Sequence, residues 1–93
     1  MKPLIKEYLE KKALIVDVRT PNEYRAGHSD GSINIPLNVL EARLSELDKN
    51  RSLILCCASG ARSGSAIGIL KNHGFENVIN AGPWTNVVKE LNA

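Results

Sequence analysis

The fold is decided by the stretch Ser52–Leu70, which reads SLILCCASGARSGSAIGIL. It begins with the apolar run Leu53–Cys56, and such a run between small and polar residues predicts a buried central strand. A segment of small residues follows, and apolar residues at helical spacing close the stretch. The order predicts a strand, a tight loop and a helix, with Cys57 at the carboxyl end of the strand.

The loop after Cys57 has the character of an anion site. Its side chains are small apart from one arginine, so its backbone amides can point inward, and the start of the next helix adds unpaired N–H groups. A thiol there loses its proton more readily, because the helix N-terminus and the Arg62 guanidinium favour the thiolate. We therefore predict Cys57 as a nucleophile, with substrate contacts from Ala58, Ser59, Gly60, Ala61 and Arg62. The other interpretation is that Cys57 is a small buried apolar residue without a chemical role.

Length and composition indicate one domain over residues 1–93, of an ordinary soluble globular type. The 93 residues are 43% hydrophobic and 24% charged. A net charge of +2 is too small to favour nucleic acid or a membrane surface as a partner. We expect neither partner, and we expect a monomer.

The cysteines and the N-terminal segment bear on the compartment. Cys56 and Cys57 are adjacent and cannot link distant segments by disulfides, which favours a reducing environment. No apolar stretch approaches the roughly 20 residues of a membrane span. Charges in Met1–Glu7 stand where a signal peptide needs its apolar centre. We expect a cytoplasmic protein, or a periplasmic one if a signal peptide has been removed.

Upstream of the central stretch, the pattern predicts alternating helices and strands. Thr20 with Glu23, and Asn38 with Glu41, each have the spacing of a helix-capping box. The nearly continuous apolar run over 13–18 predicts a strand that is covered on both faces. The predicted elements are a helix over 3–12, a strand over 13–18, a helix from 21 to Gly27, a strand over 33–35 and a helix from Asn38 to about Lys49.

Downstream, we predict a helix C-cap at Gly74, a strand over 77–80, a loop over 81–84 and a terminal helix over 86–91. Alternating strands and helices with short connections predict an α/β fold, a parallel β-sheet flanked by helices on both faces. In such a sheet the carboxyl ends of the strands share one edge. Cys57, Asp17, Arg19 and the 82–84 loop are therefore expected to meet there. Gly64 and Gly68 are expected to let their helix approach the sheet closely.

Five short segments occur in a specific order and at specific spacings: Ile15–Arg19, Glu23–Tyr24, Gly27–His28, Gly31–Pro36 and Cys57–Ser63. Together they resemble a single-domain rhodanese, a thiosulfate sulfurtransferase, and the resemblance covers nearly the whole chain. It is closest to the phage shock protein E type, because Gly64 and the Asn80–Gly82 segment also match that group.

The resemblance implies a single rhodanese-like domain and sulfur transfer. Cys57 would take the outer sulfur of a donor such as thiosulfate, become a persulfide, and pass the sulfur to cyanide or a thiol. Such covalent catalysis suits a soft nucleophile, and loop amides can stabilise anionic groups without a general base. The resemblance implies no metal and no organic cofactor. It implies a small-molecule donor and acceptor as partners, or a sulfur-accepting protein such as a thioredoxin.

The chain departs from the family pattern at one residue and at one segment. Many relatives carry a charged residue directly after the cysteine, where this chain has Ala58, so recruitment of thiosulfate would depend on Arg62 and the amides. The usual Gly-Gly segment near the C-terminus is replaced by Gly82–Trp84. Slow turnover would follow, which keeps open a non-catalytic sulfur carrier or rhodanese-like interaction module.

An alternative assignment starts from Cys56. From this residue the spacing is Cys-x5-Arg-Ser, the pattern of a phosphatase or arsenate reductase, with Cys56 attacking and Arg62 binding two oxygens. The strand pattern opposes it by burying Cys56. Of the other polar residues, His28 is expected to satisfy local backbone groups, Asp17 and Arg19 to brace the strand end, and Trp84 to serve in packing.

Overall fold

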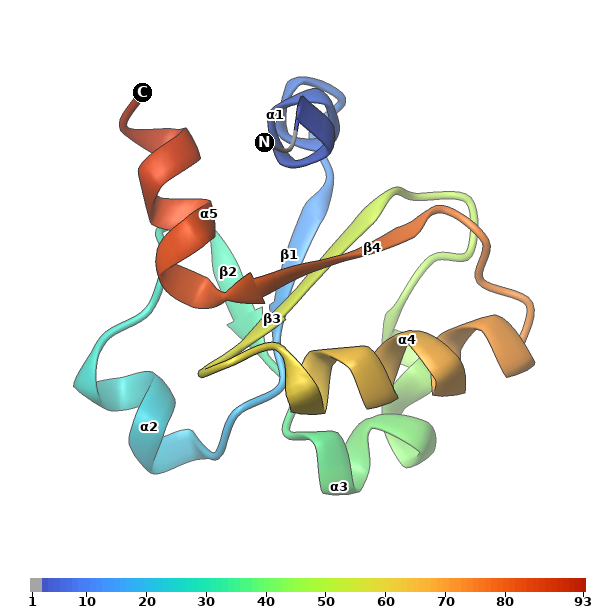
Figure 1. Ribbon diagram of the computed structural model, residues 1–93. Coiled ribbons are helices and arrows are strands. Elements are labelled where there is room, and N and C mark those ends of the chain that lie inside the picture. Colours follow the sequence, from blue (N-terminus) through green and yellow to red (C-terminus); the bar gives the residue numbers. More distant parts are fainter. Residues whose placement is uncertain (1–2) are drawn as a thin grey trace.

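The computed structural model describes residues 3–93 and contains one parallel four-stranded sheet with the order β2-β1-β3-β4 (Figure 1). Helices lie on both sides of this sheet, as predicted. The strands are β1 (Leu14–Asp17), β2 (Ser32–Asn34), β3 (Leu53–Cys57) and β4 (Val78–Pro83). The helices are α1 (Pro3–Glu10), α2 (Pro21–Ala26), α3 (Leu37–Leu40), the 3₁₀ helix η1 (Glu41–Glu46), α4 (Ala61–Asn72) and α5 (Trp84–Leu91).

The central strand β3 is buried along its whole length and pairs with β1 on one side and β4 on the other. Val16 is the partner of Leu55, and Leu55 is also the partner of Asn80. The register with β4 then shifts, so that Cys56 pairs with Gly82. This irregularity brings the Asn80–Gly82 segment to the end of β3, where the Cys57 loop begins.

The alternation of side chains along β3 divides the core into two clusters. Cys57 belongs to the cluster beneath α3 and α4, which includes Leu40 and Leu70. Cys56 belongs to the cluster beneath α1 and α5, which includes Ile5 and Val87. Two adjacent thiols therefore lie on opposite faces of the sheet, as the period of two in a strand requires.

The short helix α2 has the predicted capping box. The Thr20 hydroxyl accepts a hydrogen bond from the Glu23 amide at 3.3 Å, and the Glu23 carboxylate accepts one from the Thr20 amide at 2.9 Å. Two unpaired amides at the helix start are thus satisfied. The carboxylate of Glu23 is held in place by its own helix.

Three predictions about the elements were wrong. Asn38 does not cap a helix, because α3 begins at Leu37 with Pro36 at the N-cap. That helix does not run regularly to Lys49: it becomes the 3₁₀ helix η1, which is kinked at Arg43 and ends at Glu46. The 81–84 segment is not a loop, because β4 continues through Pro83 and α5 starts at Trp84. A proline is tolerated there because β4 is an edge strand.

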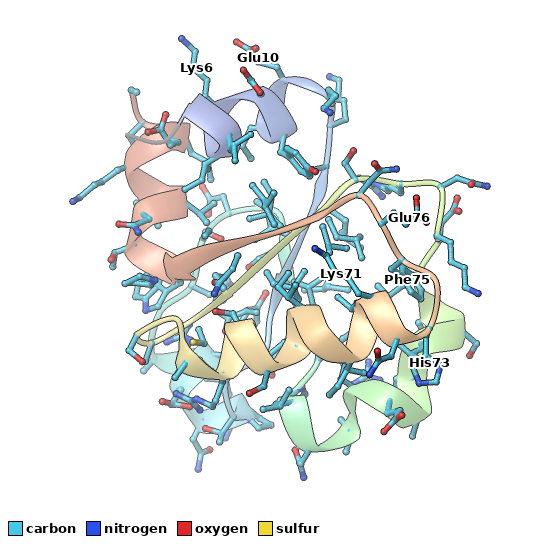
Figure 2. All side chains as sticks on the ribbon, turned by 45° about the vertical axis from the view of Figure 1, so that its right-hand side comes forward. Lys6, Glu10, Lys71, His73, Phe75 and Glu76 are labelled. Carbon is cyan, nitrogen blue, oxygen red and sulfur yellow. The ribbon has the colours of Figure 1, made fainter. Side chains whose placement is uncertain are left out.

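The first helix, α1, turns its charged residues to the solvent and its apolar residue Ile5 to the core. Lys6 and Glu10 extend outward from α1 (Figure 2). Gly68 of α4 faces open space, so the prediction that it permits close packing on the sheet was wrong. Within residues 3–93, no helix has the length and apolar character needed to cross a membrane.

Candidate active site

The loop after β3 wraps its donors around the sulfur of Cys57. The Gly60 amide donates to Cys57 Sγ at 2.9 Å and the Ser63 amide at 3.4 Å, and the Ser63 hydroxyl lies 3.4 Å from the same sulfur. The side chain of Cys57 is fully buried, whereas Ala58 and Ser59 are exposed. Amides of the loop therefore surround the sulfur of Cys57. The substrate contacts expected from Ala58–Arg62 stay a prediction.

The conformation of this loop depends on Gly60. Gly60 is the N-cap of α4 with a φ of 106°, in the left-handed region that favours glycine. A Cβ at this position would lie 3.2 Å from the Cα of Gly82 on β4. The turn that aims the amides inward is thus fixed by backbone contact between two segments.

These hydrogen bonds favour the thiolate form of Cys57. Burial raises the pKa of the Cys57 thiol. The Ser63 hydroxyl lowers it when its proton points to the sulfur, and the Ser63 amide lowers it as well. The amides of Gly60 and Ser59 lower it further, so the net pKa lies below that of an ordinary cysteine. The loop therefore favours the thiolate over the thiol at Cys57.

Cys56 has the opposite environment. Burial, together with the nearby Asp17 carboxylate, raises the pKa of the Cys56 thiol to about 12. No loop amide is within hydrogen-bond distance of it in the part of the chain that the structure describes. The geometry therefore favours Cys57 over Cys56 as the nucleophile, and it opposes the Cys-x5-Arg assignment.

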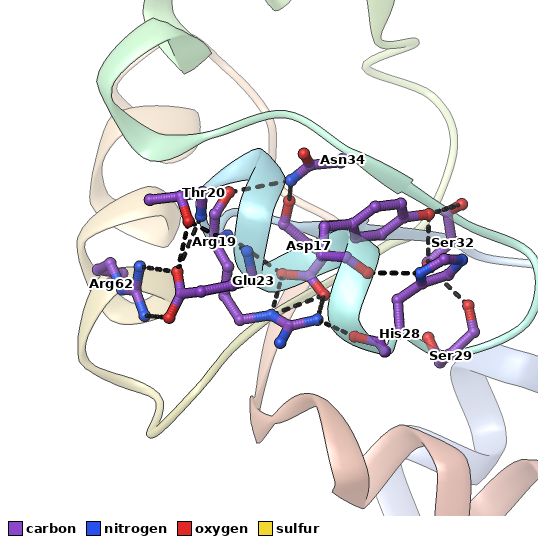
Figure 3. A network of polar contacts seen from close by, with 11 residues as sticks. Asp17, Arg19, Thr20, Glu23, His28, Ser29, Ser32, Asn34 and Arg62 are labelled. Atoms are coloured by element: carbon purple, nitrogen blue, oxygen red, sulfur yellow. Dashed lines mark hydrogen bonds and ion pairs between the residues drawn. The ribbon is translucent and has the colours of Figure 1, made fainter.

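Arg62 does not contact the sulfur but forms an ion pair with Glu23 of α2 (Figure 3). Its Nη1 and Nη2 donate to the two carboxylate oxygens at 2.7 and 3.0 Å. The Arg62 guanidinium and the Thr20 amide hold the pKa of Glu23 down to about 2. The predicted cationic contact is thus largely neutralised by a partner 39 residues away, and its role in substrate binding stays a prediction.

Asp17 and Arg19 brace the end of β1, as predicted (Figure 3). Arg19 Nη2 lies 2.7 Å from the Asp17 carboxylate, and both residues are buried. The guanidinium also donates to the Gly27 carbonyl at 2.7 Å and lies 4.9 Å from the centre of the Trp84 ring. This pair joins β1, the end of α2 and the start of α5 next to the Cys57 loop.

His28 satisfies local backbone, again as predicted. Its Nδ1 donates to the Tyr24 carbonyl at 2.7 Å, and the two rings stack with centroids 3.8 Å apart.

No group of three or more metal-ligating side chains occurs among residues 3–93.

Two residues of the site carry roles that sequence reasoning missed. Ser63 is one of several small residues in the loop, and nothing in the sequence indicates that its buried hydroxyl faces the sulfur. Asn80 belongs to a segment that matches the family pattern, and nothing in the sequence indicates its hydrogen bonds to Ser63, Gly60 and Gly82. Only the three-dimensional contact between β4 and the start of α4 connects them.

An open hollow of about 590 Å³ adjoins the outer side of the loop. It lies between α1, α5 and β4, and its lining includes Ser59, Gly60, Asn80, Asn86 and Lys89. Its size is in the range of small-molecule sites. The hollow therefore reaches the loop that surrounds the sulfur.

Cys57 lies at the end of a strand of a parallel sheet, and loop amides surround its thiol. Comparison with known sequences finds a family that agrees with this arrangement. The profile of the rhodanese-like domain family matches residues 2–86, and the chain belongs to that family. The family comprises sulfurtransferases and related proteins that act with sulfur donors and acceptors.

Three similar proteins illustrate the range of the family. Thiosulfate sulfurtransferase PspE of Escherichia coli is 41% identical over 69 residues, which cover 72% of this chain and 66% of PspE. YrkF of Bacillus subtilis, a proposed sulfur carrier protein, is 41% identical over 75 residues, which cover 76% of this chain and 40% of YrkF. The solved structure of an E. coli rhodanese with anions has 37% identity and a TM-score of 0.75, over 80% of this chain and 89% of that one. The matched region thus spans less than two thirds of either curated relative.

Proposed function

We propose that this protein is a thiosulfate sulfurtransferase that carries sulfane sulfur on Cys57 as a persulfide. The observation that carries the proposal is the pair of amides, of Gly60 and Ser63, that donate to Cys57 Sγ and favour the thiolate at the end of β3. The similarity to PspE supports thiosulfate as the donor.

The reaction consists of two displacements at sulfur. The Cys57 thiolate attacks the outer sulfur of thiosulfate and forms a new S–S bond, while the bond to the sulfite group breaks and sulfite leaves with the electron pair. Cyanide or a thiolate then attacks the outer sulfur of the persulfide. The bond to Sγ breaks, and its electron pair returns to Cys57 as the thiolate.

The loop supports both steps with fixed dipoles. The amides of Gly60 and Ser63 stabilise the Cys57 thiolate before the first displacement and again as it leaves in the second. The remaining backbone of Ala58–Arg62 is available to the anionic donor and to the departing sulfite. The step uses no general base, because the loop amides favour the thiolate form of the nucleophile.

The test is the intact mass of the reduced protein after brief exposure to thiosulfate, followed by cyanide. We expect a gain of one sulfur atom that disappears with cyanide, persists in Cys56→Ser and is absent in Cys57→Ser. A gain that only Cys56→Ser abolishes, or no gain in the wild type, would contradict the proposal.

A second candidate function is a sulfur carrier that exchanges sulfur with a protein partner. Ala58 offers no charge, Arg62 is paired with Glu23, and the similarity to YrkF points the same way. The two functions separate in steady-state turnover. Rapid thiocyanate production favours the enzyme, whereas a persulfide that forms but passes only to a protein thiol such as that of thioredoxin favours the carrier.

A further inference from the structure

The hydroxyl of Ser63 has three acceptors within reach but a single proton. Its oxygen lies 2.6 Å from Asn80 Oδ1, 3.2 Å from the Gly60 carbonyl oxygen and 3.4 Å from Cys57 Sγ. A serine hydroxyl donates one hydrogen bond and accepts up to two. Only one of the three neighbours can therefore receive the proton at any time.

The orientation of the Asn80 amide is fixed by two backbone groups. Its Nδ2 donates to the Gly60 carbonyl at 3.1 Å, and its Oδ1 accepts from the Gly82 amide at 2.8 Å. In the reversed orientation Nδ2 would face the Gly82 amide, which is also a donor, and Oδ1 would face the Gly60 carbonyl, which is also an acceptor. Both hydrogen bonds would be lost. The oxygen of Asn80 therefore faces Ser63, and the shortest of the three contacts places the hydroxyl proton on Asn80.

With its proton on Asn80, the Ser63 oxygen presents only lone pairs to Cys57. It can accept the S–H of a thiol, but it cannot stabilise a thiolate until the proton rotates toward the sulfur. That rotation breaks the hydrogen bond from the Ser63 hydroxyl to Asn80 Oδ1. We propose that Asn80 is a positioning residue that competes with the Cys57 thiolate for the proton of Ser63.

The competition has a use in sulfur transfer, and this inference rests on the proposed role of Cys57. A thiolate that is stabilised too strongly is a weaker nucleophile. Sγ carries negative charge in the free thiolate and much less in the persulfide, where charge lies on the outer sulfur. Asn80 therefore moderates the thiolate and takes back the Ser63 proton when Cys57 is loaded.

Other charges near the sulfur do not change with Asn80. Cys56, on the same strand, stays protonated because its pKa is about 12. Arg62, on α4, acts on Cys57 at a distance but is paired with Glu23 of α2. Asn80 on β4 is itself uncharged, so its replacement by alanine alters hydrogen bonding without adding or removing charge.

The experiment is a pH titration of the Cys57 thiolate by its ultraviolet absorbance, which does not depend on sulfur transfer. We expect Asn80→Ala to lower the Cys57 pKa and to raise the thiolate fraction about fivefold at a pH well below it, since one neutral hydrogen bond no longer competes. The conservative Asn80→Asp keeps an acceptor for Ser63 and adds negative charge, so it should raise the Cys57 pKa.

Two controls separate this role from a general loosening of the loop. In a Ser63→Ala background, Asn80→Ala should not lower the pKa of Cys57. Asn86→Ala removes a neighbouring amide that bonds to the Ala81 carbonyl but not to Ser63, and it should leave that pKa unchanged. If Asn80→Ala raises the pKa or leaves it unchanged, or lowers it equally without Ser63, the proposal is wrong. The persulfide test could still succeed in that case.

Discussion

Replacing Glu23 with glutamine should convert Arg62 into a free cation at the site. Glutamine at this position still accepts from the Thr20 amide, so the capping box of α2 survives. What is lost is the carboxylate that Arg62 contacts at 2.7 and 3.0 Å. The substitution therefore separates the charge of Glu23 from its structural role.

The expected change in the KM for thiosulfate follows from the solvent exposure of the Glu23 and Arg62 side chains. The two side chains are 36% and 37% exposed, so solvent screens their charges, and exposed pairs of this kind change an equilibrium by about two- to fivefold per unit charge. Thiosulfate carries two negative charges. We expect its KM to fall about tenfold in Glu23→Gln, with kcat little changed, because charge recruits the donor without altering the displacement.

The assay is thiocyanate production at varied thiosulfate concentration and ionic strength. The lower KM should disappear at high salt, and an uncharged organic trisulfide should show no such gain. Glu46→Gln is the matched control, since it breaks the pair between Glu46 and Arg43 and makes the same change in net charge far from the site. If both variants lower the KM equally, or if Glu23→Gln leaves it unchanged, Arg62 does not recruit the donor.

Two further substitutions, at Gly60 and Asp17, test how the site is built, and a third, at Gly68, is the control for the first. Gly60→Ala should abolish persulfide formation and lower the free energy of unfolding by about 1–3 kcal/mol, because it strains a residue with left-handed φ and places a Cβ 3.2 Å from the Gly82 Cα. Gly68→Ala, in open space on the same helix, should instead raise the free energy of unfolding by about 0.5–1 kcal/mol. Asp17→Asn should cost about 3 kcal/mol in urea unfolding, because it leaves the buried Arg19 charge without its partner. A loss below about 1 kcal/mol would show that the pair is not needed as a brace.

The central strand, its loop and its helix could be predicted because their signals are local. The apolar run before Cys57, the small residues after it and the capping box at Thr20 each act within a few residues. The same locality explains the error at Asn38. Its spacing to Glu41 has the form of a capping box, but the helix starts one residue earlier, after Pro36.

The parts of the site that escaped prediction depend on contacts between distant segments. Arg62 was expected to face the substrate, and nothing near it in sequence indicates Glu23 as its partner. The link between Ser63 and Asn80 likewise requires β4 to lie beside the start of α4. An asparagine in a strand and a serine in a loop are each unremarkable until the sheet order places them together.

The pleat of β3 has a consequence for how sulfur would leave the proposed persulfide on Cys57. Because neighbouring residues of a strand face opposite ways, Cys56 lies across the sheet from Cys57, in a different cluster of the core. Cys56 is the other cysteine of these 93 residues, and from the far face of the sheet it cannot act as the resolving thiol for a persulfide or a sulfenic acid formed on Cys57. On the proposed function, sulfur loaded on Cys57 stays until a thiol or cyanide from outside this domain removes it, and the supply of that acceptor would set the lifetime of the loaded state.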